Sequence, residues 1–425
     1  MNAVVHPIAP AAAQAAPAAP HGASPSDYSR CSFWPPERGM LDALTRALKE
    51  AFTNAPVTPP RDALLSPGLA GGIGNAREPS VKDVWFDLPV LPDVEPPPPL
   101  PGAHGPASHE RFQLHGLLAP RRYDKRGLKA PLFVVVPGFF DSVEQHYVRD
   151  TLAACAEMGG SVLTLDMRDH GDTRRHGMRG GAQPVRYSFG RFEGADVVGV
   201  LEQLADAVPE HVRDVYLIGY SGGARTVLRA METLAAASDA TRRKVDFVSS
   251  RAASSMLRVR GALAVCPPID VAATLGGIAT AFGHFFDQLA RLRGLDGVNH
   301  AVWDTRAYYA ERGVDVHPAL ATHPFGFEAL PDERLVEAVA LSTIVMAEDD
   351  PVVGRAQFDA YAAALGPRLG AARAPLGLFQ RHLLRCQKGG HCAFVVVNQA
   401  LTRRWLWSWV QHAMAVADRA APAGA

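Results

Sequence analysis

Short apolar runs alternate with helix-length amphipathic segments from Pro131 onward. Runs rich in β-branched residues and bounded by turn residues are typical of buried strands, and four of them read LFVVVPG, VYLIG, GALAVC and LSTIVMA. Between these runs, residues 143–158 and 192–208 carry apolar side chains at helical spacing, and a further helix is expected from Gly222. This alternation predicts an α/β protein with a mostly parallel sheet that is covered by helices on both faces.

Further segments extend the same plan at both ends. A strand and turn are expected in SVLTLDMRDHGDT, a last strand at 382–386 and a closing helix at 402–417. Upstream, Leu41–Phe52 has helical spacing, and Arg111–Leu118 alternates imperfectly between apolar and polar residues. We interpret the latter as part of an early antiparallel pair that precedes the parallel strands.

Changes in composition divide the chain into five regions. Residues 1–29 are rich in Ala and Pro and are expected to be a disordered arm, because they bury too little apolar surface to offset chain entropy. Residues 30–130 form an N-terminal extension with the first strands, and residues 131–270 form the first half of the core. Residues 271–338 interrupt the alternation of strands and helices with an aromatic-rich helical pattern, which we interpret as a helical lid inserted over the strand ends. Residues 339–419 complete the core.

Composition narrows the class of protein. Of 425 residues, 48% are hydrophobic and 20% charged, which allows a sizeable core, and Lys plus Arg equals Asp plus Glu at 43 each, which argues against a nucleic-acid surface. No apolar stretch approaches the roughly 18 residues of a membrane span, and the N-terminus is a poor secretory signal. Five cysteines without a CxxC pair favour reduced thiols in the cytoplasm over a disulfide framework.

The run VYLI leads into a serine with small neighbours. Gly219-Tyr220-Ser221-Gly222-Gly223 fits the pattern G-x-S-x-G between a strand and a helix. A serine there lies on a tight turn with its hydroxyl projecting, so the flanking positions need small residues. The first N–H groups of the helix point toward a developing oxyanion. This context predicts a nucleophile, and the alternative is a small-residue helix start that the serine merely caps.

A serine hydroxyl needs a base, and the base needs an orienting acid. His391 is the predicted base, because it lies in the glycine-flanked loop KGGHCAF after a candidate strand. The acid is expected just past LSTIVMA, where Asp350 fits best and Glu348 or Asp349 is the alternative. Asp270, after GALAVCPPI, is a further candidate because it also follows a strand. The other interpretation of the acidic cluster is a solvated turn before proline.

A second oxyanion donor is expected from the loop VVVPGFFDS. Gly138 allows a close approach of the backbone there, and the N–H of Phe139 is the predicted donor. The N–H of Gly222 is the predicted partner donor. A backbone N–H does this work, so the side chain at the position is free to vary, and the alternative is an ordinary strand-to-helix turn.

Aromatic residues suggest where an apolar substrate would bind. Phe282, Phe285 and Phe286 lie at helical spacing in the insertion and are candidates for lining an acyl pocket. Phe140, in the oxyanion loop, and Tyr220, beside the serine, suggest an apolar mouth. The alternative for the helical stripe is simple packing against the domain beneath it.

The chain resembles the α/β-hydrolase superfamily in five segments that occur in the family's order. They are VVVPGFFDS, LDMRDHGDT, GYSGG, AEDDPVV and KGGHCAF, and they resemble the oxyanion loop, the turn after strand four, the nucleophile elbow, the acid loop and the histidine loop. A fainter resemblance, in CPPIDVAATLGGIA and DTRAYY, is to the YheT-like esterase and lipase branch. Pro137 stands where the family usually has His, and Asp169 replaces a Gly of the R-G-H-G turn, in which we interpret His170 as structural.

The resemblance implies a serine hydrolase that cleaves a carboxylic ester or thioester through an acyl-enzyme without a cofactor. Ser221 would attack, His391 would transfer the proton and Asp350 would hold the imidazolium. No metal is expected, since HExxH is absent and Cys386, His391 and Cys392 are not interpreted as a metal set. The partner would be a small-molecule ester, and the oligomeric state stays open. The alternatives are a catalytically silent scaffold that acts as a binding module, and carbon–carbon bond or peptide hydrolysis on the same fold.

Overall fold

One sheet organises the described part of the chain. The computed structural model describes residues 81–92, 110–121, 130–139, 141–176, 185–207, 214–247, 256–275, 305–314, 330–348, 350, 352–372, 382–386, 391–392 and 409. Within them, nine strands form a sheet of order β1-β2-β4-β3-β5-β7-β8-β9, with β6 paired to β7. The strands are β1 (Lys82–Pro89), β2 (Arg111–Ala119), β3 (Leu132–Val136), β4 (Ser161–Leu165), β5 (Asp214–Tyr220), β6 (Val245–Phe247), β7 (Leu257–Val265), β8 (Ser342–Ala347) and β9 (Leu383–Cys386).

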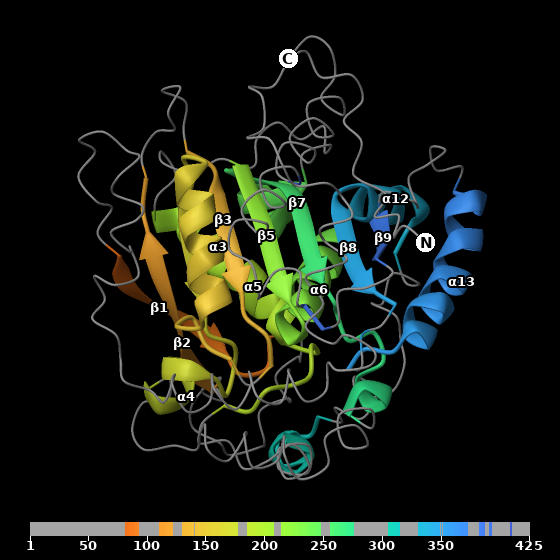
Figure 1. The fold of residues 1–425 in the computed structure, drawn as a ribbon. Coiled ribbons are helices and arrows are strands. Elements are labelled where there is room, and N and C mark those ends of the chain that lie inside the picture. The colour runs from red at the N-terminus through yellow and green to blue at the C-terminus, as the bar shows by residue number, and fades with distance from the viewer. Residues whose placement is uncertain are drawn as a thin grey trace.

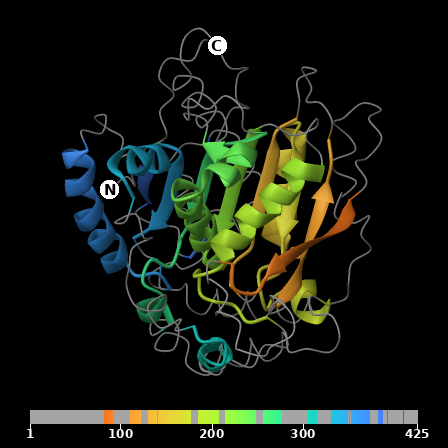
Figure 2. The ribbon, with the colours of Figure 1, turned by 180° about the vertical axis from the view of Figure 1, so that it is seen from behind.

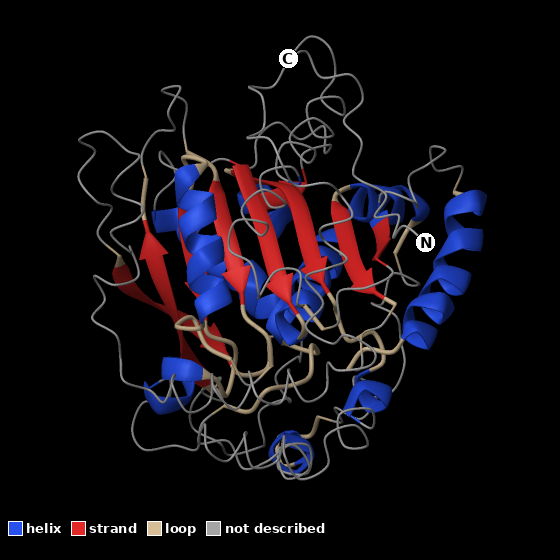
Figure 3. Ribbon diagram, viewed as in Figure 1, coloured by secondary structure: helices blue, strands red, loops and turns tan. Residues whose placement is uncertain are grey.

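Helices lie on both faces of this sheet (Figure 3). The described helices are α3 (His146–Glu157), α4 (Gly171–His176), α5 (Glu193–Ala207), α6 (Gly222–Ala235), α7 (Asp239–Lys244), α12 (Asp332–Ala340) and α13 (Arg355–Ala371). Helix α3 crosses one face in Figure 1, and α5 and α6 cover the opposite face, as Figure 2 shows from behind. None of these helices combines the length and the hydropathy that crossing a bilayer requires.

Strand β5 shows how the sequence fills both faces. All its residues from Val215 to Tyr220 are buried. Side chains alternate along a strand, so Val215 and Leu217 join the core beneath α5 and α6, while Tyr216, Ile218 and Tyr220 join the core beneath α3. A strand that packs on two faces needs a continuous apolar run rather than an alternating one, which is the pattern of VYLIG.

The order of the strands creates a crevice at one edge of the sheet. Strands β4 and β5 both pair with β3 in parallel, on its two sides. The chain therefore passes from β3 to β4 on one side and returns to β5 on the other, with α3 on one face and α5 on the other. At such a reversal the loops after neighbouring strands leave in opposite directions, and ligands of open α/β sheets bind in the crevice they leave. The loops after β3 and β5 carry the predicted oxyanion donor and nucleophile.

The predicted fold class is confirmed, and the differences lie in individual elements. The early antiparallel pair is present as β1 and β2, and β2 also runs antiparallel to β4. The expected helix at 143–158 begins only at His146, and the expected strand at 261–266 begins already at Leu257. Strand β6 and helices α4, α7 and α13 had no counterpart among the elements expected from the sequence.

The expected insertion is described only in part. Helix α12 falls largely within 271–338, yet it packs against α6, α13 and β8, so this segment lies with the core. Residues 276–304 and 315–329, with the three phenylalanines of the predicted acyl pocket, lie outside the described residues. The same holds for the arm at 1–29, the helix expected at 41–52 and, apart from buried Trp409, the helix expected at 402–417.

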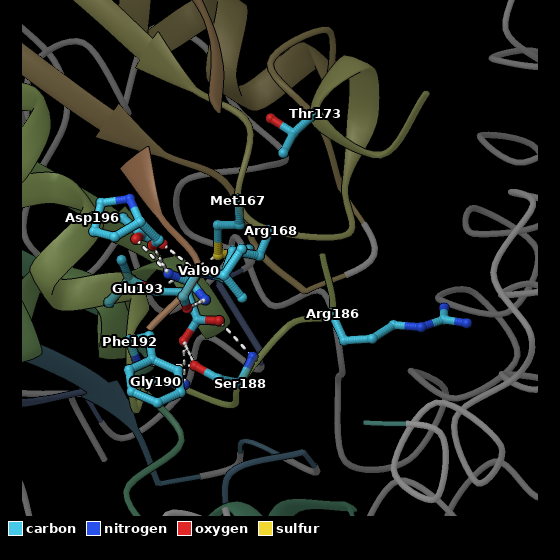
Figure 4. A network of polar contacts seen from close by, with 12 residues as sticks. Val90, Met167, Arg168, Thr173, Arg186, Ser188, Gly190, Phe192, Glu193 and Asp196 are labelled. Carbon is cyan, nitrogen blue, oxygen red and sulfur yellow. Dashed lines mark hydrogen bonds and ion pairs between the residues drawn. The ribbon is translucent and has the colours of Figure 1, made fainter. Parts of the chain in front are cut away.

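A buried arginine ties the turn after β4 to three other segments (Figure 4). The guanidinium of Arg168 donates to both carboxylate oxygens of Asp196 on α5, at 2.6 and 2.7 Å. It also donates to Val90 O at 2.6 Å and to the hydroxyl of Tyr309 at 3.1 Å. Because a buried charge needs a partner, these contacts fix the R-D-H-G turn in place, in agreement with the structural role predicted for it.

Candidate active site

Ser221 lies at the turn between β5 and α6 in a backbone conformation with positive φ, with φ 50° and ψ −117°. Its backbone N–H donates to Val265 O at 2.8 Å, which anchors the turn to the neighbouring strand β7. Positive φ is rare outside glycine and is commonly found at functional sites. Within the described residues the Ser221 hydroxyl makes no capping bond to α6, so the alternative interpretation as a plain helix cap finds no support.

The glycines around the serine are required by contact with backbone. A Cβ at Gly219 would stand 2.2 Å from Gly223 O, and a Cβ at Gly223 would stand 2.2 Å from Pro137 O. Both distances are far below van der Waals contact, and the obstructing atoms belong to backbone that cannot rotate away. The first turn of α6 is therefore pressed directly against the loop after β3, and the motif's small residues follow from that contact.

A chain of hydrogen bonds runs from Ser221 through His391 to Asp350. Ser221 Oγ lies 2.8 Å from His391 Nε2, and His391 Nδ1 lies 2.9 Å from Asp350 Oδ2. A carboxylate only accepts, so Nδ1 carries a hydrogen and Nε2 of the neutral ring is free to accept the serine proton. The His391 side chain is 18% exposed and that of Asp350 is 0% exposed. The chain thus leads from a reachable hydroxyl to a fully buried carboxylate.

Asp350 is held by backbone as well as by the histidine. Its Oδ1 accepts from the N–H groups of Val352 and Val353, at 2.8 and 2.9 Å. These two bonds replace the water that the buried carboxylate loses, and they leave Oδ2 to face His391. The local turn that follows β8 therefore fixes both the charge and the direction of the acid.

The other acidic candidates have different partners. Glu348 forms an ion pair with Arg355, in which Glu348 Oε2 lies 3.8 Å from Arg355 Nη1. Asp270 accepts from the N–H of Ala273 at 2.8 Å, as a cap of the short helical segment that follows it. Asp349 lies outside the described residues. Among the described candidates, Asp350 is the one whose carboxylate reaches His391.

The electrostatic environment of His391 favours the charged form of its imidazole ring. Burial disfavours the imidazolium, but the carboxylate of Asp350 and, after it, the neighbouring sulfur of Cys392 outweigh burial and raise the pKa of His391 to about 9. The charge of Asp141, in the loop after β3, acts in the same direction. His391 is therefore set up to hold a proton that it takes from a neighbour, which is what a base of this type must do.

The loop after β3 is fixed by a tyrosine on α3. The N–H of Gly138 donates to the hydroxyl of Tyr147 at 2.7 Å, and that hydroxyl donates to Asp141 Oδ2 at 2.8 Å. A Cβ at Gly138 would stand 3.4 Å from Ser221 Cβ, and a Cβ at Gly222 would stand 3.1 Å from Phe139 N. The two predicted oxyanion donors, Phe139 N–H and Gly222 N–H, thus come from backbone segments in close contact beside the serine.

The side chain of Phe139 belongs to an aromatic group beside this loop. Its ring centroid lies 5.0 Å from that of Tyr187, 5.4 Å from that of His170 and 5.7 Å from that of Phe189. Burial of the last three and partial exposure of Phe139 give an apolar wall next to the serine. His170 is thus part of this wall as well as of the turn after β4, where its Nδ1 lies 2.5 Å from Arg168 O.

Tyr220 does not lie where an apolar mouth would need it. Only 1% of the residue is exposed, and its hydroxyl lies 2.6 Å from Thr151 Oγ1 on α3. Its ring packs edge-on against Tyr147 at 5.0 Å. Strand alternation turns Tyr220 into the core opposite to α6, so the expectation that it contacts substrate is corrected to a role in packing. Phe140, the other residue of that expectation, lies outside the described residues.

Two thiols lie beside the histidine. The sulfur atoms of Cys266, at the end of β7, and of Cys392 lie with a ring nitrogen of His391 within 4.8 Å of one another. The sequence-based set had Cys386 in place of Cys266, and it was not expected to bind metal. The signal that was available is that Cys266 directly follows a parallel strand, at the edge of the sheet where the other site residues gather.

The family follows from comparison with known proteins. A model of the alpha/beta hydrolase family matches residues 133–401, which contain the serine, the histidine and the acid. The chain belongs to the alpha/beta hydrolase family. Membership of the YheT-like branch stays a prediction. No curated protein matches the sequence of this alpha/beta hydrolase.

Solved structures similar to this alpha/beta hydrolase include several esterases. An esterase of Pyrococcus furiosus is 15% identical, with a TM-score of 0.40 over 70% of this chain and 87% of that chain. A hyperthermophilic esterase of Pyrobaculum calidifontis is 13% identical, with a TM-score of 0.43 over 89% of this chain and 94% of that chain. Est1E of Butyrivibrio proteoclasticus, solved with ferulic acid, is 13% identical, with a TM-score of 0.36 over 72% and 96%.

The raised pKa of His391 can be tested without any assay of activity. We expect the histidine to titrate above 6.5 in the native chain, and Asp350→Asn to lower its pKa, because burial remains and the largest compensating charge is lost. The measurement is NMR titration of ring-labelled histidine, with His391→Gln to assign the signal. Asp141→Asn, which removes a more distant charge, should lower the pKa by less. An unchanged pKa in Asp350→Asn would contradict the proposed pairing.

Proposed function

We propose that this alpha/beta hydrolase is a serine hydrolase that cleaves a carboxylic ester or thioester through an acyl-enzyme. The observation that carries the proposal is the unbroken hydrogen-bonded chain from Ser221 Oγ through His391 to Asp350. An otherwise inert alcohol gains a base at 2.8 Å, and that base gains a buried anion at 2.9 Å that stabilises its charged form. The scaffold of esterases fits this chemistry, although the fold alone does not select it.

The reaction would proceed in two transfers that balance protons. In the first, Ser221 Oγ adds to the carbonyl carbon of the ester while its proton passes to His391 Nε2. The bond from that carbon to the leaving alcohol or thiol then breaks, and His391 returns the proton to the departing atom. In the second, water replaces the serine hydroxyl as the nucleophile, and the acid leaves as Ser221 recovers its proton.

Two backbone N–H groups would stabilise the negative charge that develops on the carbonyl oxygen. The first-turn N–H of Gly222 has no acceptor within its own helix, because the opening N–H groups of any helix lack one. The contact between Gly222 and Phe139 brings a second N–H alongside. Donors fixed before the reaction cost no reorganisation, and each typically contributes about 100- to 1000-fold to the rate.

An apolar acyl group fits the surface next to the serine. The partly exposed ring of Phe139, which packs on the buried rings of Tyr187 and Phe189, offers an aromatic surface there. Each methylene that leaves water for such a surface contributes about 0.8 kcal/mol. We therefore infer that the enzyme prefers an ester with an apolar acyl chain over a short one.

A fluorophosphonate probe tests the nucleophile directly. We expect it to label the native protein and to leave Ser221→Ala unlabelled, because the probe's phosphorus accepts only an activated serine. His391→Ala should label far more slowly, since the hydroxyl then lacks its base. The labelling rate should also rise with pH through the raised pKa of His391, because only the neutral ring accepts a proton. A folded native protein that takes up no label would favour the silent scaffold.

The role of the oxyanion loop can be tested through Tyr147, a positioning residue. Tyr147→Phe removes the acceptor of the Gly138 N–H and the donor to Asp141. Because the loop that carries Phe139 N–H then loses its anchor, we expect kcat for ester hydrolysis to fall about tenfold with KM changed less than about twofold.

The matched control for that variant is Tyr361→Phe. Its hydroxyl is also buried and lies 2.7 Å from His382, but it belongs to a different part of the core. Both variants lose one buried hydroxyl, so thermal unfolding should shift in both. A fall in kcat that is equal in the two variants would point to general destabilisation and against positioning of the loop.

Acyl-chain preference is tested with p-nitrophenyl esters of increasing length. We expect kcat/KM to be at least about tenfold higher for the hexanoate than for the acetate, since each buried methylene contributes about 0.8 kcal/mol. Phe139→Ala keeps the backbone N–H and removes part of the aromatic wall, so it should reduce this preference more than it reduces acetate turnover. An enzyme that favours the acetate would contradict the apolar assignment.

A further inference from the structure

We propose that Cys266, Cys392 and His391 form a binding site for a thiophilic divalent cation of the Zn²⁺ class, and that the occupied site switches the hydrolase off. The binding itself depends only on the three side chains. Its effect on turnover rests on the proposed function, because it requires His391 to be the base.

The geometry suits such a cation. One ligand atom from each of the three residues lies within 4.8 Å of the other two. With Zn–S bonds of about 2.3 Å, two thiolates of a tetrahedral zinc ion stand about 3.8 Å apart, so only small shifts separate this cluster from a three-ligand site. Two sulfurs and one imidazole nitrogen are also a donor set that favours Zn²⁺ and disfavours Mg²⁺ or Ca²⁺, which prefer oxygen.

The backbone holds the two thiols at this point. Cys266 has φ 50° and Cys392 has φ 59°, both in the left-handed region that side chains rarely adopt. The backbone N–H of Cys266 donates to Val345 O at 2.7 Å, and Cys392 Sγ lies 3.6 Å from Val265 O. The ends of β7 and β8 thus fix the sulfurs beside the histidine. An ordinary pair of packed core thiols does not require two such conformations.

Metal binding and catalysis exclude each other at His391. Nδ1 is used by Asp350 and Nε2 is used by Ser221, so a cation on either nitrogen breaks one of the two bonds on which the proposed mechanism depends. The thiols bind as thiolates and the ring binds through an unprotonated nitrogen, so each proton on these ligand atoms passes to water as the ion binds. The partly exposed edge of His391 gives the ion a way in, whereas both cysteines are buried.

The test titrates reduced, chelator-treated full-length protein with Zn²⁺ during hydrolysis of a p-nitrophenyl ester, and with Cd²⁺ during measurement of ultraviolet absorption. We expect Zn²⁺ to abolish turnover reversibly, with recovery on addition of EDTA, and Mg²⁺ to have no effect. Cd²⁺ should produce the thiolate-to-metal charge-transfer band at one equivalent of ion, a readout that needs no activity.

Serine variants assign the ligands. Groups that hydrogen-bond to a metal ligand typically contribute about ten- to a hundredfold to the affinity for the metal. Loss of a ligand itself should therefore lower the affinity for Zn²⁺ at least about tenfold. Cys266→Ser and Cys392→Ser, each confirmed as folded by circular dichroism, should therefore need at least about tenfold more Zn²⁺ for half-inhibition of their own metal-free rate. Cys155→Ser is the matched control, because Cys155 is an equally buried free thiol in α3, outside the cluster.

The outcomes separate this proposal from the preceding one. A native protein without the charge-transfer band, or cysteine variants as sensitive to Zn²⁺ as the native chain, would overturn the metal site. A native protein that shows the band but hydrolyses no ester without metal would uphold the site and overturn the proposed function. Inhibition that is weakened equally in Cys155→Ser would mean a general effect of thiol loss, and would also overturn the site.

Discussion

The contact between the first turn of α6 and the loop after β3 is the constraint on which the rest of the site depends. Parallel pairing sets Val136 opposite Gly219, so the ends of β3 and β5 leave the sheet at the same level. The chain after β5 must then turn into a helix within a space where Gly223 already touches the carbonyl of Pro137. A larger residue at Gly223 would push the two segments apart. The distance between the serine and the oxyanion loop therefore follows from the register between β3 and β5 and from the presence of glycine, which has no side chain, at position 223.

Much of this could be predicted, because each prediction rested on a local rule. Continuous apolar runs such as Val215–Ile218 are typical of strands buried on two faces, and the order of polar residues after successive strands placed Ser221, Asp350 and His391 at one edge. Helix α13 was not predicted: its buried residues Phe358, Tyr361, Leu365 and Leu369 do recur at helical spacing, but the alanines around the rest of the helix blur the contrast between faces, and Pro367 inside the segment argues against a helix. Strand β6 is only three residues long, too short for any periodicity.

The errors in the predicted site arose because proximity in the sequence does not tell in which direction a side chain points in the folded protein. Tyr220 is bonded to Ser221, yet strand alternation turns it to the opposite face of the sheet, against Tyr147. Cys266 is far from His391 in sequence, and no spacing rule joins them, although both follow strands of the same sheet. What the sequence lacks is the register between β7 and β8, which brings Val345 O to the N–H of Cys266 and so sets the depth of its sulfur.

Strain and charge converge on the same small region. Among the described residues, the non-glycine positions with positive φ are Asp169, Phe189, Ser221, Cys266 and Cys392. Ser221 is the proposed nucleophile, and Cys266 and Cys392 are the thiols beside His391. Asp169 precedes His170, which belongs to the aromatic wall beside Phe139, and Phe189 is itself part of that wall. Each such residue costs of order 1–3 kcal/mol and persists only where surrounding structure fixes it. The nearly full burial of both faces of the central strands supplies that support. The rigid sheet therefore stabilises strained backbone conformations at the carboxyl ends of its strands. The same rigidity fixes His391 between a carboxylate, a hydroxyl and two sulfurs, so that these groups compete for its two ring nitrogens.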